Sequence, residues 1–197
     1  MIVNLQQQGT LTGLDLTSTL INLLLPQGTI LTDDPGPTSA EKRAAVRRRA
    51  AIPAEDEASS QEGLGGYHGS VHSNGATIYY AIGVYSEQTA NGANGIPVFD
   101  QPWKNVVATF YHELNEARTD ADVEDAIRTN NTSVLGWTSK KGEEIGDFPV
   151  DETGGNLSKV FREVPLTDGS GTVPVQFLYS NAVHGPEGPI AKPHPVT

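Results

Sequence analysis

Two strand-forming runs joined by Asn74-Gly75 constrain the fold of this 197-residue chain more than any other feature. The runs are YHGSVHS (67–73) and ATIYYAIGVYS (76–86), both rich in β-branched and aromatic residues. Asn and Gly tolerate positive φ, which the two-residue turn of a tight hairpin requires. The sequence therefore predicts an antiparallel hairpin, whose second strand is a candidate for edge pairing with an extended peptide.

The longest helical pattern covers about residues 102–118, within the segment WKNVVATFYHELNEARTD. Pro102 suits the first position of a helix, and Asp100 or Gln101 can cap it. Apolar residues recur at helical spacing and predict a single apolar face on this helix. That face consists of Trp103, Val106, Val107, Phe110, Leu114 and Ala117.

Three further segments have strand-like composition: 18–31, 157–166 and 172–181. Together with the hairpin and the helix they predict an α+β fold, in which a mostly antiparallel sheet packs on the central helix and the C-terminal part is rich in loops. We expect one domain over residues 1–185, with a basic helix and linker inserted at 39–62. Residues 186–197 are Pro-rich and predict a disordered tail.

The chain has a formal net charge of −11, so it repels nucleic acid and anionic membranes, and we expect neither as a partner. Eleven of its acids but only four of its bases lie between residues 112 and 152. Such a region attracts cations, although most of these acids also suit an ordinary solvated surface. The basic stretch at 39–51 is best interpreted as an exposed helix that balances the acidic remainder.

Cysteine is absent, which excludes disulfides, thiolate zinc sites and cysteine nucleophiles. The N-terminal segment MIVNLQQQGT lacks the basic and apolar regions of a signal peptide. The longest apolar run, LINLLL at 20–25, is too short to span a bilayer. We therefore expect a soluble protein, either cytoplasmic or a secreted form whose leader is missing. The oligomeric state stays open.

The string HELNE at 112–116 places an H-E-x-x-E pattern on the predicted helix. At about 100° per residue, His112 and Glu116 lie roughly 40° apart, on the side away from the apolar face. An imidazole nitrogen and a carboxylate oxygen can then bind the same ion, and Zn²⁺ accepts this ligand set. Glu113 occupies the position of the general base in H-E-x-x-H metallopeptidases. The same pair at i and i+4 also stabilises a helix without any metal.

A third protein ligand is required, because a catalytic zinc site uses three protein ligands and one water. Asp147, in the loop GEEIGD (142–147), is one candidate. Asp120 lies eight residues beyond His112 and reaches the ion only if the helix bends or ends near residues 117–119. Glu144 and His68 are further candidates.

Six segments follow one another along the chain: LINLLLPQGTIL, GGYHGSVHSNGATIYYAIGVY, HELNEARTD, LGW, GEEIGD and VPVQFLYSN. This series resembles a family of zincin-like proteins that includes the EXORDIUM/phosphate-induced proteins of plants and uncharacterised bacterial and oomycete relatives. The resemblance covers roughly residues 19–182 and implies a metallopeptidase-like fold with a peptide or protein substrate. Carried over residue by residue, it points to His112, Glu113, Glu116, Asp120 and Asp147, with His68 and Asn181 as lesser matches.

The chain departs from the family pattern at three places. Ala121 stands where the family has a Pro after T-D, and Tyr179 replaces a Trp before Ser180-Asn181. The accompanying cysteines are also missing, which fits a bacterial or intracellular branch.

Three interpretations follow. The leading one is a zinc-dependent hydrolase of peptide bonds. The second is a non-catalytic zincin-like binding or structural module, with or without a structural ion. The third is an acidic interaction protein that uses the helix at 39–51 as a docking element.

Overall fold

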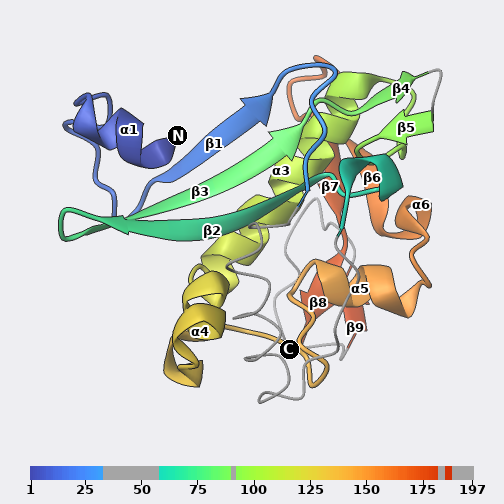
Figure 1. Cartoon of the computed structure of the whole chain (residues 1–197). Coiled ribbons are helices and arrows are strands. Elements are labelled where there is room, and N and C mark those ends of the chain that lie inside the picture. The colour runs from blue at the N-terminus through green and yellow to red at the C-terminus, as the bar shows by residue number, and fades with distance from the viewer. Residues whose placement is uncertain (33–57, 90–91, 182–184, 188–197) are drawn as a thin grey trace.

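The computed structural model describes residues 1–32, 58–89, 92–181 and 185–187. The predicted basic helix at 39–51 lies outside these residues. Within them the protein is α+β: a three-stranded sheet lies against the long helix α3 (Pro102–Thr119), and the C-terminal segments pack on another side of that helix (Figure 1).

The predicted hairpin is confirmed. Strands β2 (Gly66–Ser73) and β3 (Ala76–Val84) pair antiparallel, and the turn residues Asn74 and Gly75 have φ of 51° and 76°. The third strand, β1 (Leu20–Leu25), pairs in parallel with β3. The sheet is therefore mixed, with order β1-β3-β2. Because β3 is the middle strand, the expectation that it offers an edge to a peptide is wrong.

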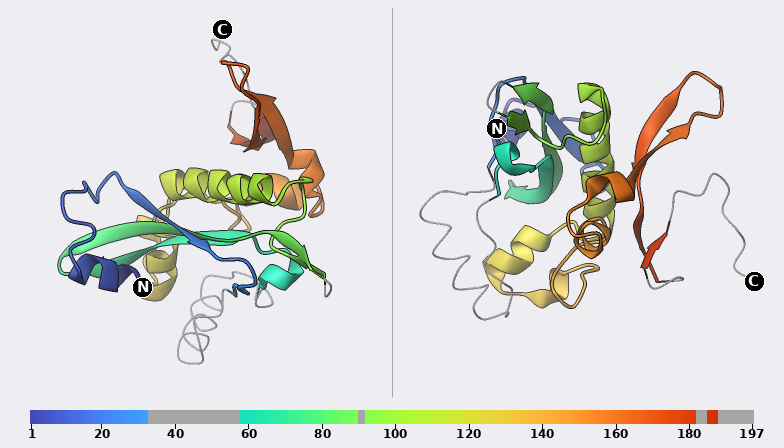
Figure 2. Two further views of the ribbon diagram at one scale, coloured as in Figure 1. Left: turned by 90° about the horizontal axis from the view of Figure 1, so that it is seen from above. Right: turned by 90° about the vertical axis from the view of Figure 1, so that its right-hand side faces the viewer.

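The two faces of the sheet are covered differently, as side-chain alternation along a strand requires. Ile78 and Tyr80 of β3 face the N-terminal segment, where they pack with Ile2 and Leu11. That segment includes helix α1 (Ile2–Gln7), which lies on the opposite side of the sheet from α3 (Figure 2). The other face carries Gly83, against which the ring of Phe110 packs.

Small residues allow α3 to approach this second face closely. A Cβ on Gly83 would lie 2.9 Å from the Phe110 ring, and one on Gly66 would lie 2.8 Å from Cγ2 of Thr109. Gly66 pairs with Gly83, and two positions along the hairpin His68 pairs with Ala81. His68 is thus the one large polar side chain that these pairs direct toward the helix.

The C-terminal part packs on α3 through strand β7 (Thr172–Gln176), which pairs with β6 (Phe161–Pro165). Helix α6 (Leu157–Val160) lies beside β6, and helix α5 (Asp147–Glu152) contacts α6 and β8 (Leu178–Ser180). A second apolar cluster fills this region: Ile96, Ala108, Val160 and Phe161, with Val98, Phe99, Val150 and Leu157 around them. The segment expected to be a strand over 157–166 therefore begins as a short helix.

The remaining described elements are short. They are β4 (Glu87–Thr89), β5 (Gly92–Asn94), α4 (Val123–Thr129), β8 (Leu178–Ser180), β9 (Gly185–Glu187) and two single 3₁₀ turns at 60–62 and 132–134. Strand β9 pairs with β8, so residues 186 and 187 of the expected tail are ordered into a strand. Residues 188–197 lie outside the described part of the chain. No described helix has the length and apolar character to cross a membrane.

Helix α3 occurs where the sequence predicts it, but its faces are used differently. Trp103 and Leu114, expected in the apolar face, are 48% and 42% exposed. The buried side chains of this helix are instead mostly polar or small: Asn105, Val106, Ala108, Thr109, Glu113 and Glu116. The reason is that α3 lies between the sheet and β7, so both flanks are enclosed. The carboxylates of the H-E-x-x-E string consequently face the protein interior.

Candidate metal site

Three side chains from two helices converge at the buried flank of α3. Nε2 of His112 lies 3.1 Å from Oε2 of Glu116 and 3.3 Å from Oδ1 of Asp147. Ligand bonds of about 2.0–2.1 Å in a tetrahedral arrangement place neighbouring ligand atoms about 3.3–3.4 Å apart. The three atoms all lie within 4.8 Å of one another. Their spacing therefore suits one zinc-sized cation.

Gln176 of β7 fixes the protonation of His112. Its side-chain Nε2 donates to the carbonyl of Gly146 at 2.8 Å, so its Oε1 must be the atom that faces Nδ1 of His112, also at 2.8 Å. An amide oxygen only accepts, and Nδ1 therefore carries the proton. In the neutral imidazole this leaves the lone pair on Nε2, directed toward Glu116 and Asp147. A hydrogen bond to the distal ring nitrogen is the usual support of a metal-binding histidine.

The loop before α5 has to pass very close to the helix. The N–H of Gly146 donates to Oε1 of Glu116 at 3.2 Å. A Cβ at this position would lie 2.6 Å from Nδ1 of His112 and 2.8 Å from Oε1 of Glu116, closer than any side chain allows. Gly146 thus brings Asp147, the next residue, to the site. Its hydrogen bond uses Oε1 of Glu116, so that Oε2 is the oxygen that faces His112.

Of the two expected third ligands, the structure brings Asp147 to the site and not Asp120. The chain leaves the helical conformation at Asp120, which is the C-cap of α3. Its Oδ1 accepts from the N–H of Gly136 at 2.7 Å, which anchors the following loop. Helix α3 does end at Thr119, but the bond to Gly136 holds this carboxylate, and the ligand group around His112 contains Asp147 and not Asp120.

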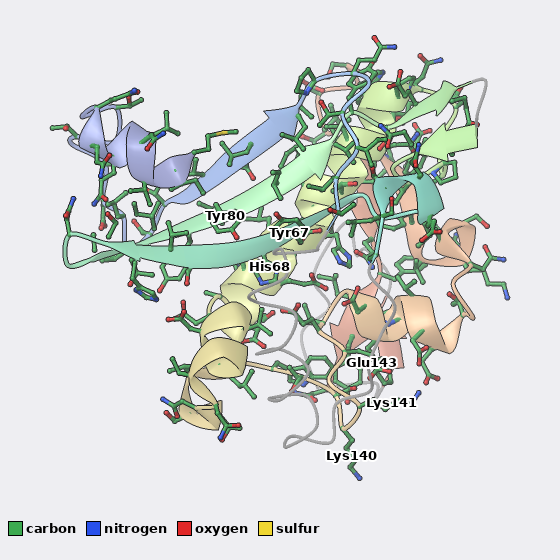
Figure 3. The ribbon with its side chains drawn as sticks, viewed as in Figure 1. Tyr67, His68, Tyr80, Lys140, Lys141 and Glu143 are labelled. Atoms are coloured by element: carbon green, nitrogen blue, oxygen red, sulfur yellow. The ribbon has the colours of Figure 1, made fainter. Side chains whose placement is uncertain are left out.

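A second histidine, His68 of β2, enters the same buried region (Figure 3). Its Nδ1 lies 3.3 Å from Oε2 of Glu113 and 3.8 Å from Oε2 of Glu116. Its Nε2 lies 3.0 Å from the main-chain oxygen of Asp120, which can only accept a hydrogen bond. His68 and Glu113 are 5% and 4% exposed. Glu113, expected as the base, is thus held against a histidine from the neighbouring sheet.

The carboxyl groups of this region are buried close together, and the pKa values of three of them are raised. Burial and the neighbouring carboxylates raise the pKa of Glu116 to about 7, although His112 opposes this. Burial and the charge of Glu116 raise the pKa of Glu144 to about 9. Burial also raises the pKa of Asp120. These carboxyl groups favour their neutral forms unless positive charge lies among them.

The pKa values of the two histidines are raised and that of Asp147 is lowered, so these three groups favour their charged forms. Burial lowers the pKa of His68, but the hydrogen bond to Glu113 and the charge of Glu144 outweigh it and raise the value to about 9. Burial also opposes charging of His112, yet the Glu116 charge raises its pKa well above the usual value. Partial desolvation opposes the charging of Asp147, whose side chain is 52% exposed, yet its hydrogen bond with His112 lowers its pKa. Without a metal, protons supply the positive charge that the site requires.

Among the lysine and arginine side chains that the structure describes, none forms an ion pair with Glu113, Glu116, Glu144 or Asp147. Lys141 pairs with Asp151 at 2.9 Å, and both Lys140 and Lys141 lie away from His68 (Figure 3). Oε1 of Glu144 is buried without a hydrogen-bond partner. Among the described side chains, His68 and His112 are therefore the groups that face these carboxylates and can balance their charge.

This chain matches no protein-family model, no curated protein and no solved structure. The chemistry of the site is consequently inferred from its own donor atoms. The sequence predicts His112, Glu113, Glu116, Asp147 and, as a further candidate, His68, and the structure brings these side chains together; the sequence does not predict Gln176 or Gly146. A Gly immediately before a candidate acidic ligand is a weak signal of close approach, and Gln176 stands in the segment VPVQFLYSN, on which the resemblance rests, although no role is assigned to it there.

Proposed function

We propose that this protein is a zinc-dependent metallohydrolase of the zincin-like class and that it cleaves peptide bonds. The convergence of Nε2 of His112, Oε2 of Glu116 and Oδ1 of Asp147 carries the proposal. One neutral nitrogen and two carboxylate oxygens form a ligand set that suits Zn²⁺ and leaves a position for water. The hydrogen bond from His112 to Gln176 supports the same assignment.

Zinc in such a site lowers the pKa of a bound water to about 7 and polarises a carbonyl oxygen. The chain's own contribution is to hold and to move protons. Gln176 keeps the proton of His112 on Nδ1, so that Nε2 stays available as a ligand. Glu113 follows His112 directly, and its contact with His68 uses Oε2, so Oε1 is the oxygen left for a proton. That oxygen would accept the proton of the attacking water and return it to the leaving amine.

An extended peptide would bind along strand β2. Among the described strands of the main sheet, β1 and β2 are at the edges. Strand β2 carries His68, whose ring lies beside Glu113 and Glu116. Main-chain pairing with this strand would place a substrate next to the site without demanding a particular side chain.

A second candidate function is a non-catalytic module that uses the same cluster to hold a structural ion. The contact that favours it is the one between Glu113 and His68, whose other nitrogen bonds to the main chain of Asp120. This network ties β2 to the C-terminal end of α3, as a purely structural device would.

Two measurements test the proposal. Elemental analysis of purified protein should find zinc, and His112→Ala should lower the zinc content by one ion per chain. Hydrolysis of a quenched fluorescent casein by the wild-type protein should require that ion. Zinc binding without any hydrolysis would favour the structural module, whereas an unchanged zinc content in His112→Ala would contradict both functions.

A further inference from the structure

The two buried histidines are held in the same manner. In each ring one nitrogen faces an acceptor that has no proton to give: Gln176 Oε1 for His112, and the main-chain oxygen of Asp120 for His68. The other nitrogen of each ring faces carboxylates. In neutral His68 the lone pair would therefore lie on Nδ1, opposite Oε2 of Glu113. Two lone-pair atoms at 3.3 Å repel each other unless a proton or a cation lies between them.

Both open nitrogens converge on one carboxylate oxygen. Oε2 of Glu116 is 3.1 Å from Nε2 of His112 and 3.8 Å from Nδ1 of His68. Because Oε1 of Glu116 accepts from the Gly146 N–H, Oε2 is the oxygen left to bind cations. The carboxylate of Glu116 thus belongs to two ligand groups: one with His112 and Asp147, the other with His68 and Glu113.

All three side chains of the second group are at least nine-tenths buried: His68, Glu113 and Glu116 are 5%, 4% and 2% exposed. They come from two different elements, β2 and α3, so no local sequence preference brings them together. The region also holds an unpartnered carboxyl oxygen, because the buried Oε1 of Glu144 has no hydrogen-bond partner and lies 3.5 Å from Nε2 of His68. Asp120, 1% exposed, likewise has a buried Oδ2 without a partner. One divalent cation neutralises only part of these carboxylates.

We propose that the protein holds a second divalent cation, bound by Nδ1 of His68, Oε2 of Glu113 and Oε2 of Glu116. The site is dinuclear, and Glu116 is the ligand that its two halves share. This inference deepens the proposed function and rests on it, because the first half is the zinc site of His112 and Asp147. Zinc is the cation expected, since an imidazole nitrogen and carboxylate oxygens form the ligand set.

The second cation is compatible with the role of Glu113 as a base. It uses Oε2 of that carboxylate, and Oε1 is left for proton transfer. It also gives His68 a function that the first site does not need. In paired sites two ions about 3.5–4 Å apart stabilise the attacking and the departing groups together, and a shared carboxylate oxygen is the simplest way to hold them at such a distance.

Zinc stoichiometry tests the inference without any substrate. The wild-type chain, freed of metal with a chelator and titrated with zinc at pH 7.5, should bind two ions per chain. His68→Ala and His112→Ala should each bind one. His72→Ala is the matched control, because His72 lies on the same strand but belongs to a different, more exposed group of possible ligands with Asp122 and Asp125. It should still bind two ions.

The outcomes separate the two proposals. If the wild-type chain binds one ion that is lost in His112→Ala but kept in His68→Ala, the second site is overturned and the first stands. If no ion binds, both are overturned. A second ion that disappears in His72→Ala rather than in His68→Ala also overturns the inference. Should His68→Ala fail to fold, crystals of the wild-type protein grown with zinc decide the question: two anomalous peaks, one beside Nδ1 of His68, support the dinuclear site, and a single peak beside His112 contradicts it.

Discussion

Oε1 of Gln176 lies 2.8 Å from Nδ1 of His112, and the two residues come from β7 and α3, 64 positions apart in the sequence. The contact settles which ring nitrogen is available to a metal. It also explains why the C-terminal strands pack on the helix here, since a buried amide needs partners for both its oxygen and its nitrogen. Gln176 finds them in His112 and in the carbonyl of Gly146.

Replacing Gln176 should weaken zinc binding. Gln176→Leu removes the acceptor of the Nδ1 proton, so the ring can rotate or change tautomer. We expect the zinc affinity to fall about 10–100-fold, as for other partners of metal-binding histidines. Gln176→Glu keeps an acceptor and should lose less affinity. Titration of zinc against a competing chelator measures both, with the exposed Gln88→Leu as control. Equal affinities in Gln176→Leu and wild type would refute this role.

Replacing Glu113 should separate catalysis from metal binding. Glu113→Gln keeps the size and an oxygen ligand but cannot accept a proton. Hydrolysis of the casein probe should fall by about 10²–10⁴-fold, while zinc remains bound. The exposed Glu152→Gln is the matched control and should leave the rate unchanged. Full activity in Glu113→Gln would mean that another group is the base.

The two aspartates expected as alternative ligands should behave differently. Asp147→Asn replaces an oxygen that lies 3.3 Å from Nε2 of His112, so zinc affinity should fall by about 100-fold or more. Asp120→Asn keeps an oxygen for the N–H of Gly136 and should leave zinc affinity within about twofold. Calorimetric titration of the two variants side by side decides between them. The reverse order of affinities would reinstate Asp120 as the ligand.

The sequence predicts local features of this protein well because they depend on local chemistry. The Asn74-Gly75 turn and the helix after Pro102 follow from backbone preferences of a few residues. The orientation of that helix does not, because it depends on two partners distant in sequence, the sheet and β7. Trp103 and Leu114 are therefore exposed where the pattern predicted an apolar core, and Glu113 and Glu116 are buried.

The candidate site likewise combines contacts that local sequence predicts with contacts that depend on distant segments. Helical spacing suffices to pair His112 with Glu116, since both lie on one turn. The approach of His68 requires the pairing of β2 with β3 and the small residues beneath α3. The choice of Asp147 over Asp120 requires the position of the loop that contains Gly146. Neither is encoded in a short window of sequence.

A matched pair of glycine variants tests the close approach of that loop. Gly146 has φ of −88°, which any residue adopts, so Gly146→Ala is opposed only by contacts with His112 and Glu116. We expect a fall in zinc affinity of about tenfold or more, since both ligands must shift. Gly142 has φ of +96°, and a Cβ added there would meet no other atom within 4 Å. Gly142→Ala should lower stability by about 1 kcal/mol through backbone strain and leave zinc affinity unchanged.

Zinc titration together with thermal unfolding distinguishes the two effects. If both variants lose stability but keep the wild-type zinc affinity, the loop has enough freedom to accommodate a methyl group at Gly146, and the close contact does not control the site.

The stability of the metal-free protein should decrease between pH 6.5 and pH 9. Folding raises the pKa of His68 to about 9, so the stabilisation from its imidazolium is fully present below about pH 6.5 and is lost as the pH rises through 9. Folding also raises the pKa of Glu144 to about 9. A carboxyl group with a raised pKa costs stability progressively above its unfolded value, and the loss is complete above pH 9. Deprotonation of either residue, His68 or Glu144, thus lowers the stability of the folded protein as the pH rises.

Bound zinc should reverse this trend, because His68 and His112 bind a cation only after losing a proton. The difference in Tm between the zinc-loaded and the chelated protein should accordingly widen from pH 6.5 to pH 9. Differential scanning fluorimetry at constant ionic strength measures it, with protein loaded with zinc before dilution into each buffer. In His68→Ala the chelated protein should lose less Tm over this range than the wild type does. A chelated wild type whose Tm stays constant or rises would show that His68 and Glu144 are not the charge-bearing pair of the buried cluster.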